Sequence, residues 1–412
     1  MEVGLGAAAP TERSARRWTL LSLLTGAFGG GAFGMLGVSP LSPRLLEAFA
    51  LSRLEVGLLL PAAYIGGLVF ALPGGYLADR VGVRAAFVGG LLITGGPLVG
   101  AALAPSFPAF LGFLVVAGIG WSLVNPALAR VILVLFAPRE RGIAMGIKQM
   151  GLTLGGIASA LVLPALAGAA GWRVAVGLCA AVVGLGALIA WSVLSGFAAP
   201  AGAPDGGSSG GASAWWWLGR PGLLVLFGAG LVLGMVQSAF LGYFPLFAVQ
   251  GQGFTVVAAG GLLAAAQTGG ALARLGLGAA SDRWHARGRP PWLAATGAVS
   301  AMAFAVYAGW PTGSPVAATV VAVGAGVGAL GWVGLYLVLV AEVGGAHRAG
   351  LLTGVGMAFI ILGILIGAPA FGAILEASDS WAAAWGSLAV LSAAAALALY
   401  VAGSVIHRES GS

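Results

Sequence analysis

Charge is scarce in this chain, and so are the residues that build disulfides, metal sites and catalytic groups. Charged residues make up 8% of the sequence, against about 25% in ordinary soluble domains, which excludes a soluble globular protein. The single cysteine, Cys179, allows no internal disulfide and no multi-cysteine metal site. The histidines, at His285, His347 and His407, fall in predicted turns or the tail and are too dispersed for a metal site. No nucleophile has a visible partner base, so neither an enzyme activity nor a cofactor is predicted.

Apolar residues and glycine take the place of charge, because 59% of the residues are hydrophobic and 72 are glycine. Small residues let helices approach closely in lipid, where no hydrophobic force drives helices together. Runs of about 20 apolar residues cross a bilayer core of about 30 Å, and the runs here lack the alternation of a membrane barrel. The sequence predicts an all-α integral membrane protein with twelve transmembrane helices, near 18–40, 55–77, 83–104, 108–136, 142–167, 173–195, 221–249, 254–280, 291–310, 315–341, 349–374 and 381–403.

Basic residues are distributed unevenly between the two sets of connecting segments. Thirteen arginines fall in the segments assigned to one side, and only Arg44, Arg53 and Arg173 fall in those assigned to the other. Because basic segments stay in the cytoplasm, both termini are predicted to be cytoplasmic, in a bacterial-type inner (plasma) membrane. The net charge of +7 is scattered among short turns, so no nucleic acid partner is expected. Residues 1–17 lack the pattern of a cleaved signal peptide, so the first span is expected to be retained.

The middle of the chain, Phe197–Ser213, is rich in glycine, alanine, proline and serine, which is typical of a flexible linker. It separates the sixth predicted span from the seventh. The predicted domains are therefore an N-terminal six-helix bundle over 1–195, a cytoplasmic linker over 196–219 and a C-terminal six-helix bundle over 220–412.

The two halves carry the same charged turn. Gly75-Tyr-Leu-Ala-Asp79-Arg80-Val-Gly82-Val-Arg84 recurs 203 residues later as Gly278-Ala-Ala-Ser-Asp282-Arg283-Trp-His-Ala-Arg287, with Gly, Asp, Arg and Arg at the same spacing. Further matches occur at a shift of 205 for Leu36–Leu41 with Leu241–Leu246, and at a shift of 208 for Gly142, Gly146 and Gly155 with Gly350, Gly354 and Gly363. The first turn resembles the signature between helices 2 and 3 of the major facilitator superfamily of membrane transporters. The second copy is degenerate, with His285 where the first has Gly82.

This resemblance implies two parallel six-helix halves with a substrate site at their interface, and alternating access by rocking of one half against the other. It also implies that the signature turns form a cytoplasmic gate. Glu342 is expected to pair with Arg283 or Arg348, and Arg130 to stabilise the first turn through an acid such as Asp79. The residues predicted to take part in gating are Gly75, Asp79, Arg80, Gly82, Arg84, Asp282, Arg283, Arg287, Glu342 and Arg130.

Three cations lie inside predicted spans, where a charge costs at least about 2.5–3.5 kcal/mol at the helix centre. They are Arg130, Arg274 and Lys148, the only lysine, and no Asp or Glu lies in the middle of a predicted span. Cations without resident anions suggest that an anionic substrate completes the site. In the superfamily fold helices 5 and 8 are neighbours across the two halves, so Lys148 and Arg274 are expected to reach one anion. An arginine in helix 8 also resembles that of carriers for anions such as oxalate or nitrate.

Polar and aromatic residues at comparable depth are expected to complete the site, and Gln267 shares a helical face with Arg274, seven residues later. The predicted substrate-binding residues are Lys148, Arg274, Gln149, Gln267, Asn125, Gln237, Tyr243, Trp332 and Tyr336. For the uncharged members, an interhelical hydrogen bond or a packing role is an equal alternative. Lys148 could instead snorkel to the cytoplasmic interface, and Arg274 could bridge to a carboxylate at that face.

Two departures from the superfamily's proton-driven drug antiporters weigh against that activity. Leu114 stands where they carry an arginine four residues before Gly118-Ile-Gly120, and Gly151-Leu-Thr-Leu-Gly155-Gly156 lacks the proline of their helix-5 motif. The sequence therefore predicts a monomeric secondary-active or facilitative carrier, antiporter or symporter, for a small carboxylate-type organic anion. The alternative is an efflux carrier for a neutral or cationic, drug-type compound, with the buried cations structural.

Overall fold

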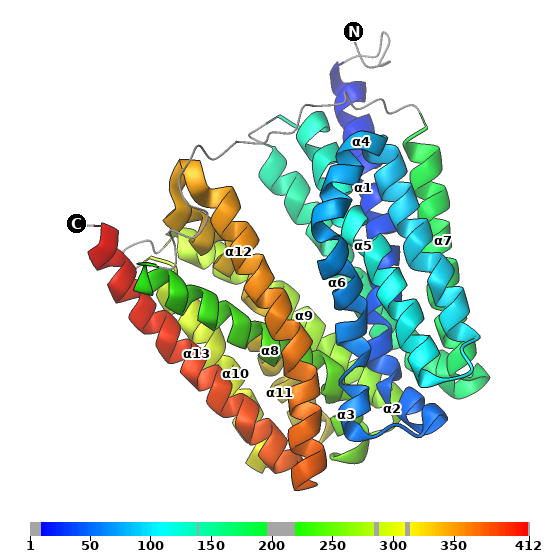
Figure 1. Cartoon of the computed structure of the whole chain (residues 1–412), viewed down its shortest axis with the longest axis vertical. Coiled ribbons are helices and arrows are strands. Elements are labelled where there is room, and N and C mark those ends of the chain that lie inside the picture. The colour runs from blue at the N-terminus through cyan, green and yellow to red at the C-terminus, as the bar shows by residue number, and fades with distance from the viewer. Residues whose placement is uncertain (1–9, 138–139, 196–218, 284–287, 310–313, 411–412) are drawn as a thin grey trace. The chain divides into compact units, whose positions relative to one another are not determined.

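The structure, a computed structural model, describes residues 10–137, 140–195, 219–283, 288–309 and 314–410 (Figure 1). Within these ranges, side chains are described except at 10–15, 71–80, 142, 282, 345–350 and 403–410. Every regular element in the described part is a helix. The chain divides into two compact units, unit 1 comprising Met1–Arg44 and Ala62–Gly206, and unit 2 comprising Leu45–Pro61 and Gly207–Ser412.

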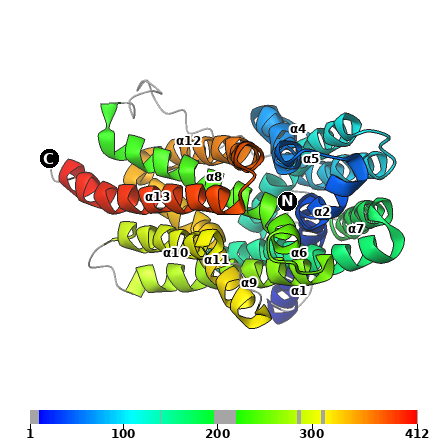
Figure 2. The ribbon, with the colours of Figure 1, turned by 90° about the horizontal axis from the view of Figure 1, so that it is seen from below.

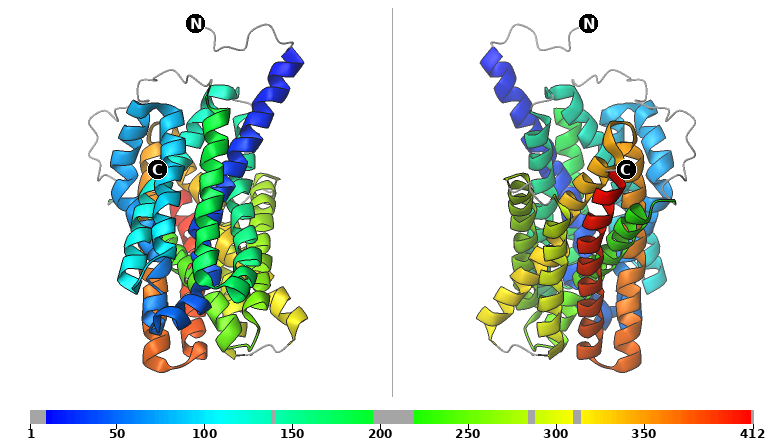
Figure 3. Two further views of the ribbon diagram at one scale, coloured as in Figure 1. Left: turned by 90° about the vertical axis from the view of Figure 1, so that its right-hand side faces the viewer. Right: turned by 90° about the vertical axis from the view of Figure 1, so that its left-hand side faces the viewer.

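Unit 1 is organised around α1 (Pro10–Leu36), which packs against α6 (Arg141–Ala170) and α7 (Trp172–Val193). Figure 3 shows α7 running beside α1. The remaining helices of this unit are α5 (Phe107–Leu135) and most of α4 (Leu59–Ala102), and α2 (Val38–Phe49) begins in it. Glycine permits the close approach of α6 to α1, because a methyl group would overlap the Gly29 backbone oxygen at Gly155 and would lie 2.5 Å from that of Thr25 at Gly151.

The signature glycine Gly82 divides α4 into two arms. A straight helix of its 44 residues would be about 66 Å long, more than twice the thickness of a bilayer core. Gly82 has φ +81° and ψ 160°, a conformation that glycine adopts without the steric cost of a side chain. The spans expected near 55–77 and 83–104 are therefore two helices that meet at Gly82, and the first arm begins at Leu59.

Unit 2 contains α8 (Pro221–Gln250), α9 (Val256–Arg283), α10 (Pro290–Gly309), α11 (Pro315–Gly331), α12 (Val333–Ser378) and α13 (Trp381–Ser410). The helix α8 packs against α12 and α13 (Figure 2), α9 packs against α11, and α10 packs against α13. The short helix α3 (Arg53–Val56) also belongs to this unit and contacts α12. Residues 45–61 follow α1 in sequence but pack with the C-terminal helices.

Among the described residues, eleven helices are long and apolar enough to cross a membrane, and Leu59–Phe70 is a shorter apolar helix. The sequence predicts twelve spans. The span that falls short is the second one, whose C-terminal part includes 71–80, where side chains are not described. The predicted linker over 196–219 lies almost entirely outside the described residues, so the proposed domain boundaries stay a prediction.

The internal repeat is visible in how the helices of each unit pack. A methyl group at Gly118 of α5 would overlap the carbonyl oxygen of Ala63 on α4, and one at Gly326 of α11 would overlap that of Ala266 on α9. Gly118 and Gly326 are 208 residues apart and Ala63 and Ala266 are 203 apart, which are the shifts seen in the sequence repeat. Equivalent glycines therefore bring equivalent helix pairs into backbone contact.

Candidate functional site

Lys148 of α6 is a buried cation without a carboxylate. The residue is 7% exposed. Its ammonium lies 3.5 Å from the backbone oxygen of Asn125 and 5.7 Å from the centre of the Phe28 ring. Among the described residues, no Asp or Glu contacts it. Since the net desolvation cost of a buried charge is recovered only by a partner, this ammonium is the clearest candidate to bind an anion.

Sequence reasoning missed three residues of α1 and α5 near this lysine, namely Phe28, whose ring lies beside the ammonium, Trp121, which stacks on Phe28, and Thr25, three residues before Phe28. The ring of Phe28 stacks on that of Trp121, with centroids 5.0 Å apart and planes at 13°. Thr25 is 8% exposed, and its hydroxyl has no hydrogen-bond partner among the described residues. Apolar and small residues on α1 carry no chemical signal of their own, and only the packing of α1 on α6 reveals them.

The polar neighbours predicted in unit 1 have a different environment. The residues Asn125 and Gln149 are exposed, and Asn125 contacts Lys148 through its backbone oxygen. Polar side chains exposed on membrane helices either line a water-filled cavity or face lipid, which is unfavourable in free energy. The third cation, Arg130, is half-buried on α5. Its predicted partner Asp79 has no described side chain, so that pairing stays a prediction.

Arg274 of α9 is half-buried and donates from Nε to the backbone oxygen of Leu330 at 2.9 Å. That carbonyl belongs to the last turn of α11, which ends at Gly331, where helix carbonyls lack partners within the helix. Gln267, two turns earlier on α9, is 8% exposed. The predicted Arg274 and Gln267 thus lie along the α9–α11 contact of unit 2.

The predicted aromatic residues of unit 2 have their polar atoms occupied inside that unit. Trp332 and Tyr336 are fully buried and meet edge to face, with centroids 5.5 Å apart. The Trp332 indole donates to Ala329 at 3.0 Å and the Tyr336 hydroxyl to Leu226 at 3.3 Å, in both cases to the backbone oxygen. These contacts favour the alternative in which Trp332 and Tyr336 pack the helices together and do not bind substrate.

Gln237 and Tyr243, both on α8, differ in whether their side-chain polar atoms have a hydrogen-bond partner among the described residues. Gln237 is half-buried, and its side-chain oxygen is buried without a hydrogen-bond partner among the described residues. Tyr243 is fully buried and donates its hydroxyl to the backbone oxygen of Arg53. Gln237 therefore retains an acceptor for a ligand or water, whereas Tyr243 holds α3.

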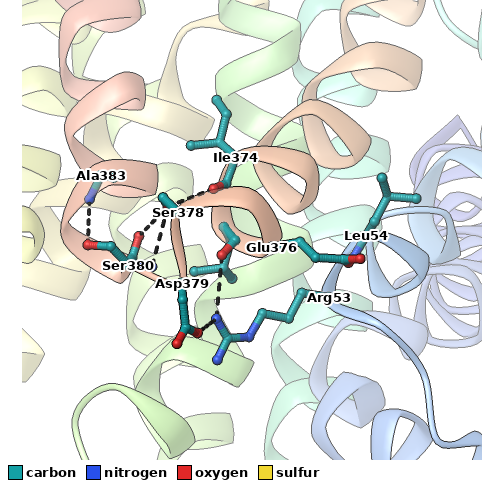
Figure 4. A network of polar contacts seen from close by, with 9 residues as sticks. Arg53, Leu54, Ile374, Glu376, Ser378, Asp379, Ser380 and Ala383 are labelled. Carbon is teal, nitrogen blue, oxygen red and sulfur yellow. Dashed lines mark hydrogen bonds and ion pairs between the residues drawn. The ribbon is translucent and has the colours of Figure 1, made fainter.

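A polar clasp, formed by Arg53, Leu54, Glu376 and Asp379, joins α3 to the C-terminal end of α12 (Figure 4). Arg53 contacts the Asp379 carboxylate at 2.5 Å and the Leu375 backbone oxygen at 3.4 Å. The backbone N–H of Leu54 donates to Glu376 at 2.9 Å. Sequence reasoning assigned none of these residues, because the pairing spans more than 320 positions in the chain.

Glycine and a capping box fix the geometry of this clasp. Ser52 accepts a hydrogen bond from the Glu55 backbone N–H while the Glu55 carboxylate accepts from the Ser52 N–H, which fixes the start of α3. A methyl group at Gly57 would lie 2.7 Å from the Ala368 oxygen, and one at Gly372 would lie 2.8 Å from the Arg53 oxygen. The backbones of the two segments are therefore in direct contact.

The predicted pairing of Glu342 with Arg283 is wrong. Arg289 instead donates from Nε to both Glu342 oxygens, at 2.8 and 2.9 Å, and from a terminal nitrogen to the Ser281 hydroxyl at 2.8 Å. Arg283, the last residue of α9, is exposed, whereas Arg289 lies beside the buried Ser281, which orients its guanidinium toward the acid. The other predicted partner, Arg348, has no described side chain.

The remaining gating residues are described only in part. Arg84 lies 3.8 Å from the centre of the Trp191 ring and donates to the Trp191 backbone oxygen at 3.4 Å, which ties the second arm of α4 to α7. The side chains of Asp79, Arg80, Asp282 and Arg287, and the surroundings of Gly75, lie outside the described residues. No group of three or more potential metal ligands occurs in the part that the structure describes.

Comparison with known sequences identifies relatives among membrane transporters. The chain is 30% identical over 286 residues to an uncharacterised MFS-type transporter of Mycobacterium tuberculosis, a match over 69% of this chain and 63% of that relative, so it spans less than two thirds of the relative's length. It is 34% identical to facilitated glucose transporter member 10 of Mus musculus, over 45% of this chain and 34% of the relative. It is 31% identical to a 3-(3-hydroxyphenyl)propionate transporter of Escherichia coli, over 27% of this chain and 28% of the relative.

Solved structures share the fold. A bacterial homologue of the human lysosomal transporter Spinster superposes with a TM-score of 0.76 over 97% of both chains at 19% identity. The nucleoside transporter NupG superposes with a TM-score of 0.77 over 93% of this chain and 99% of that chain, at 15% identity. These matches confirm the predicted fold class, an all-α integral membrane protein. The family model of the Major Facilitator Superfamily matches residues 20–360, and the chain belongs to that superfamily.

Proposed function

We propose that the protein is a secondary-active or facilitative carrier that moves a small, carboxylate-type organic anion across a membrane by alternating access. The observation that carries this proposal is the buried ammonium of Lys148, which has no carboxylate partner among the described residues. A buried charge needs a compensating partner, and a mobile anionic substrate supplies it only when bound. Burial at 7% exposure also disfavours the alternative in which Lys148 snorkels to the interface.

The relatives support different parts of this proposal. The Escherichia coli relative is named for an aromatic propionate, which is an organic anion. The mouse relative is named for glucose and keeps a neutral substrate as the second candidate. The backbone bond from Arg274 to Leu330 favours that second candidate, because it gives Arg274 a structural task. Within the described part of the chain, the one polar contact of Lys148 is 3.5 Å long, so it has no comparable bond there.

The setting that goes with this proposal is a monomer in the bacterial inner membrane, with both termini in the cytoplasm. The skewed distribution of arginine supports that orientation. With the termini inside, the clasp lies on the outer face, since α3 follows the first span and Asp379 lies between the last two. The substrate crosses the membrane by antiport, symport or facilitated diffusion, and Lys148 is its principal ligand in unit 1.

The test is ligand-induced stabilisation of the purified full chain in detergent, across carboxylates, inorganic oxyanions, sugars and organic cations. At a ligand concentration of 100 times Kd, binding stabilises the folded state by about 2.7 kcal/mol, which a thermal melt resolves. We expect carboxylates to stabilise the protein and to drive counterflow in proteoliposomes. Stabilisation by sugars or cations alone would refute the anion proposal and favour the second candidate.

We also propose that the clasp opens once in every transport cycle. Residues 45–61 are bonded through α2 and α4 to unit 1 yet pack with unit 2, so a relative movement of the two units loads this contact. The double substitution Glu376→Gln with Asp379→Asn should change the transport rate by about threefold or more. The melting temperature should hardly move, because exposed ion pairs contribute about 0.2–1 kcal/mol and Asp379 is 85% exposed.

The control for the clasp is Ser378→Ala, which removes a hydroxyl that bonds only within its own turn, to Ile374 and Ser380. A thiol cross-link tests the same idea directly. In Arg53→Cys with Asp379→Cys, a short bismaleimide should stop transport, while the unlinked protein remains active. The native Cys179 is 2% exposed and should react little. Full transport by the cross-linked protein would show that the clasp does not open.

A further inference from the structure

We infer that the substrate is an aryl carboxylate, and that the stacked pair of Phe28 and Trp121 is the surface that selects its aromatic ring. This inference rests on the proposed function, because it assumes that Lys148 binds the carboxylate. The pair is called the aromatic platform below. It lies on α1 and α5, and both helices and Lys148 belong to unit 1.

The platform adjoins the ammonium, and part of it remains exposed. The Lys148 nitrogen lies 5.7 Å from the centre of the Phe28 ring, and Phe28, 2% exposed, is covered by Trp121. Trp121 is half-buried, so part of its indole is uncovered. An aromatic ring of the substrate laid against the uncovered part of the indole, on the side of Lys148, would pack with it in the offset or edge-to-face geometry that aromatic pairs prefer.

The position of Trp121 is set by a glycine on α1. A methyl group at Gly31 would lie 2.5 Å from the distal ring of Trp121 and 3.1 Å from Leu91. Only the absence of a side chain at that position lets the indole lie flat against α1 and over Phe28. Gly31 therefore makes room for the Trp121 indole on α1, close to the place where α1 packs against the Lys148-bearing helix α6.

The unpaired hydroxyl of Thr25 gives the carboxylate a second donor. Thr25 precedes Phe28 by three residues on α1, so the two residues lie on one face. The Thr25 backbone oxygen lies 2.5 Å from the methyl position of Gly151, and Gly151 follows Lys148 by three residues on α6. Thr25 and Lys148 therefore lie beside the same contact between α1 and α6. A carboxylate has two acceptor oxygens, so it can accept from an ammonium and from a hydroxyl at the same time.

This combination discriminates against the other anions. An inorganic oxyanion would use the ammonium and the hydroxyl but leave the indole face wet, and a saturated ring would bury the same area without the favourable quadrupole geometry of stacked rings. The platform therefore favours a carboxylate whose aromatic ring lies close enough to stack while its oxygens meet Lys148. Benzoate and phenylacetate are the simplest probes of that chemistry.

The test compares pairs of acids that differ only in aromaticity. Binding to the purified full chain is measured by titration calorimetry for benzoate against cyclohexanecarboxylate, and for phenylacetate against cyclohexylacetate. We expect the aromatic member of each pair to bind roughly 3- to 10-fold more tightly, the size of a stacking contribution beyond buried area. In Trp121→Leu the ratio should fall to about one, while in Trp121→Phe, which keeps an aromatic ring, it should persist.

Two further variants separate selection from folding. Trp172→Leu removes a tryptophan that packs edge to face on Phe110 in the same unit, and it should leave the ratio unchanged. Gly31→Ala should displace the indole and lower the ratio without altering either platform residue. Equal affinity for aromatic and saturated acids, with both bindings lost in Lys148→Met, would overturn the platform and leave the anion carrier standing. Absence of binding by every acid would overturn both.

Discussion

Replacing Lys148 with methionine is expected to abolish anion transport and, at the same time, to raise the thermal stability of the ligand-free protein. Methionine has a similar length and no charge, so the substitution removes a buried ammonium with little change in volume. A cation at the centre of a membrane helix costs about 2.5–3.5 kcal/mol. Lys148 lies two turns from the start of α6, where the cost is lower, and its 3.5 Å contact to the Asn125 backbone oxygen recovers little of it. We expect a gain of about 1–3 kcal/mol in the free energy of unfolding.

The control is Arg17→Met, in the same unit. Arg17 pairs with both oxygens of Glu140, at 2.7 and 2.9 Å, and lies 5.3 Å from the centre of the Phe136 ring. Its removal leaves a half-buried carboxylate without this pair, so stability should fall where Lys148→Met raises it. Thermal melts with and without benzoate measure both effects. A loss of stability in ligand-free Lys148→Met would show that the ammonium has a structural role and would contradict the proposed function.

Alanine at Gly118 or Gly326 is expected to produce one of the largest losses of stability of any glycine-to-alanine change among the described residues. At each position the new Cβ would overlap a backbone oxygen of the neighbouring helix, Ala63 for Gly118 and Ala266 for Gly326. A backbone oxygen cannot rotate away as a side chain can, so the helix pair must separate. Overpacking costs about 1–3 kcal/mol and occasionally more, and here the separation also exposes neighbouring contacts. Melting temperature and yield of folded protein measure the effect.

The matched controls are Gly146→Ala and Gly354→Ala, which lie inside α6 and α12 and are related by the same shift of 208 residues. An added methyl group meets nothing within 4 Å at either position. Because glycine inside a helix is less stable than alanine by roughly 0.5–1 kcal/mol, these variants should be neutral or more stable. If all four substitutions had the same effect, the close backbone contacts would not determine stability.

A residue of the site could be predicted from the sequence only when its side chain differed chemically from its neighbours in the chain. Lys148 is the only lysine and lies in an apolar span, so its burial could be anticipated. Phe28, Trp121 and Thr25 resemble dozens of other residues in the spans, and only the stacking of Phe28 on Trp121 sets them apart. Glu342 shows the opposite failure, because an acid beside several arginines pairs with the one that packing orients, which is Arg289.

The amino-acid sequence by itself determined the class of this protein, its approximate spans and its internal repeat, because membrane insertion and helix spacing are local properties of composition and periodicity. Gly118 and Gly326 can be read in the sequence, but their close contacts with the backbone of a neighbouring helix cannot. Only the tertiary structure decided that residues 45–61 pack with the C-terminal helices and that an aromatic platform adjoins Lys148. Both depend on contacts between helices distant in sequence, which no local pattern specifies.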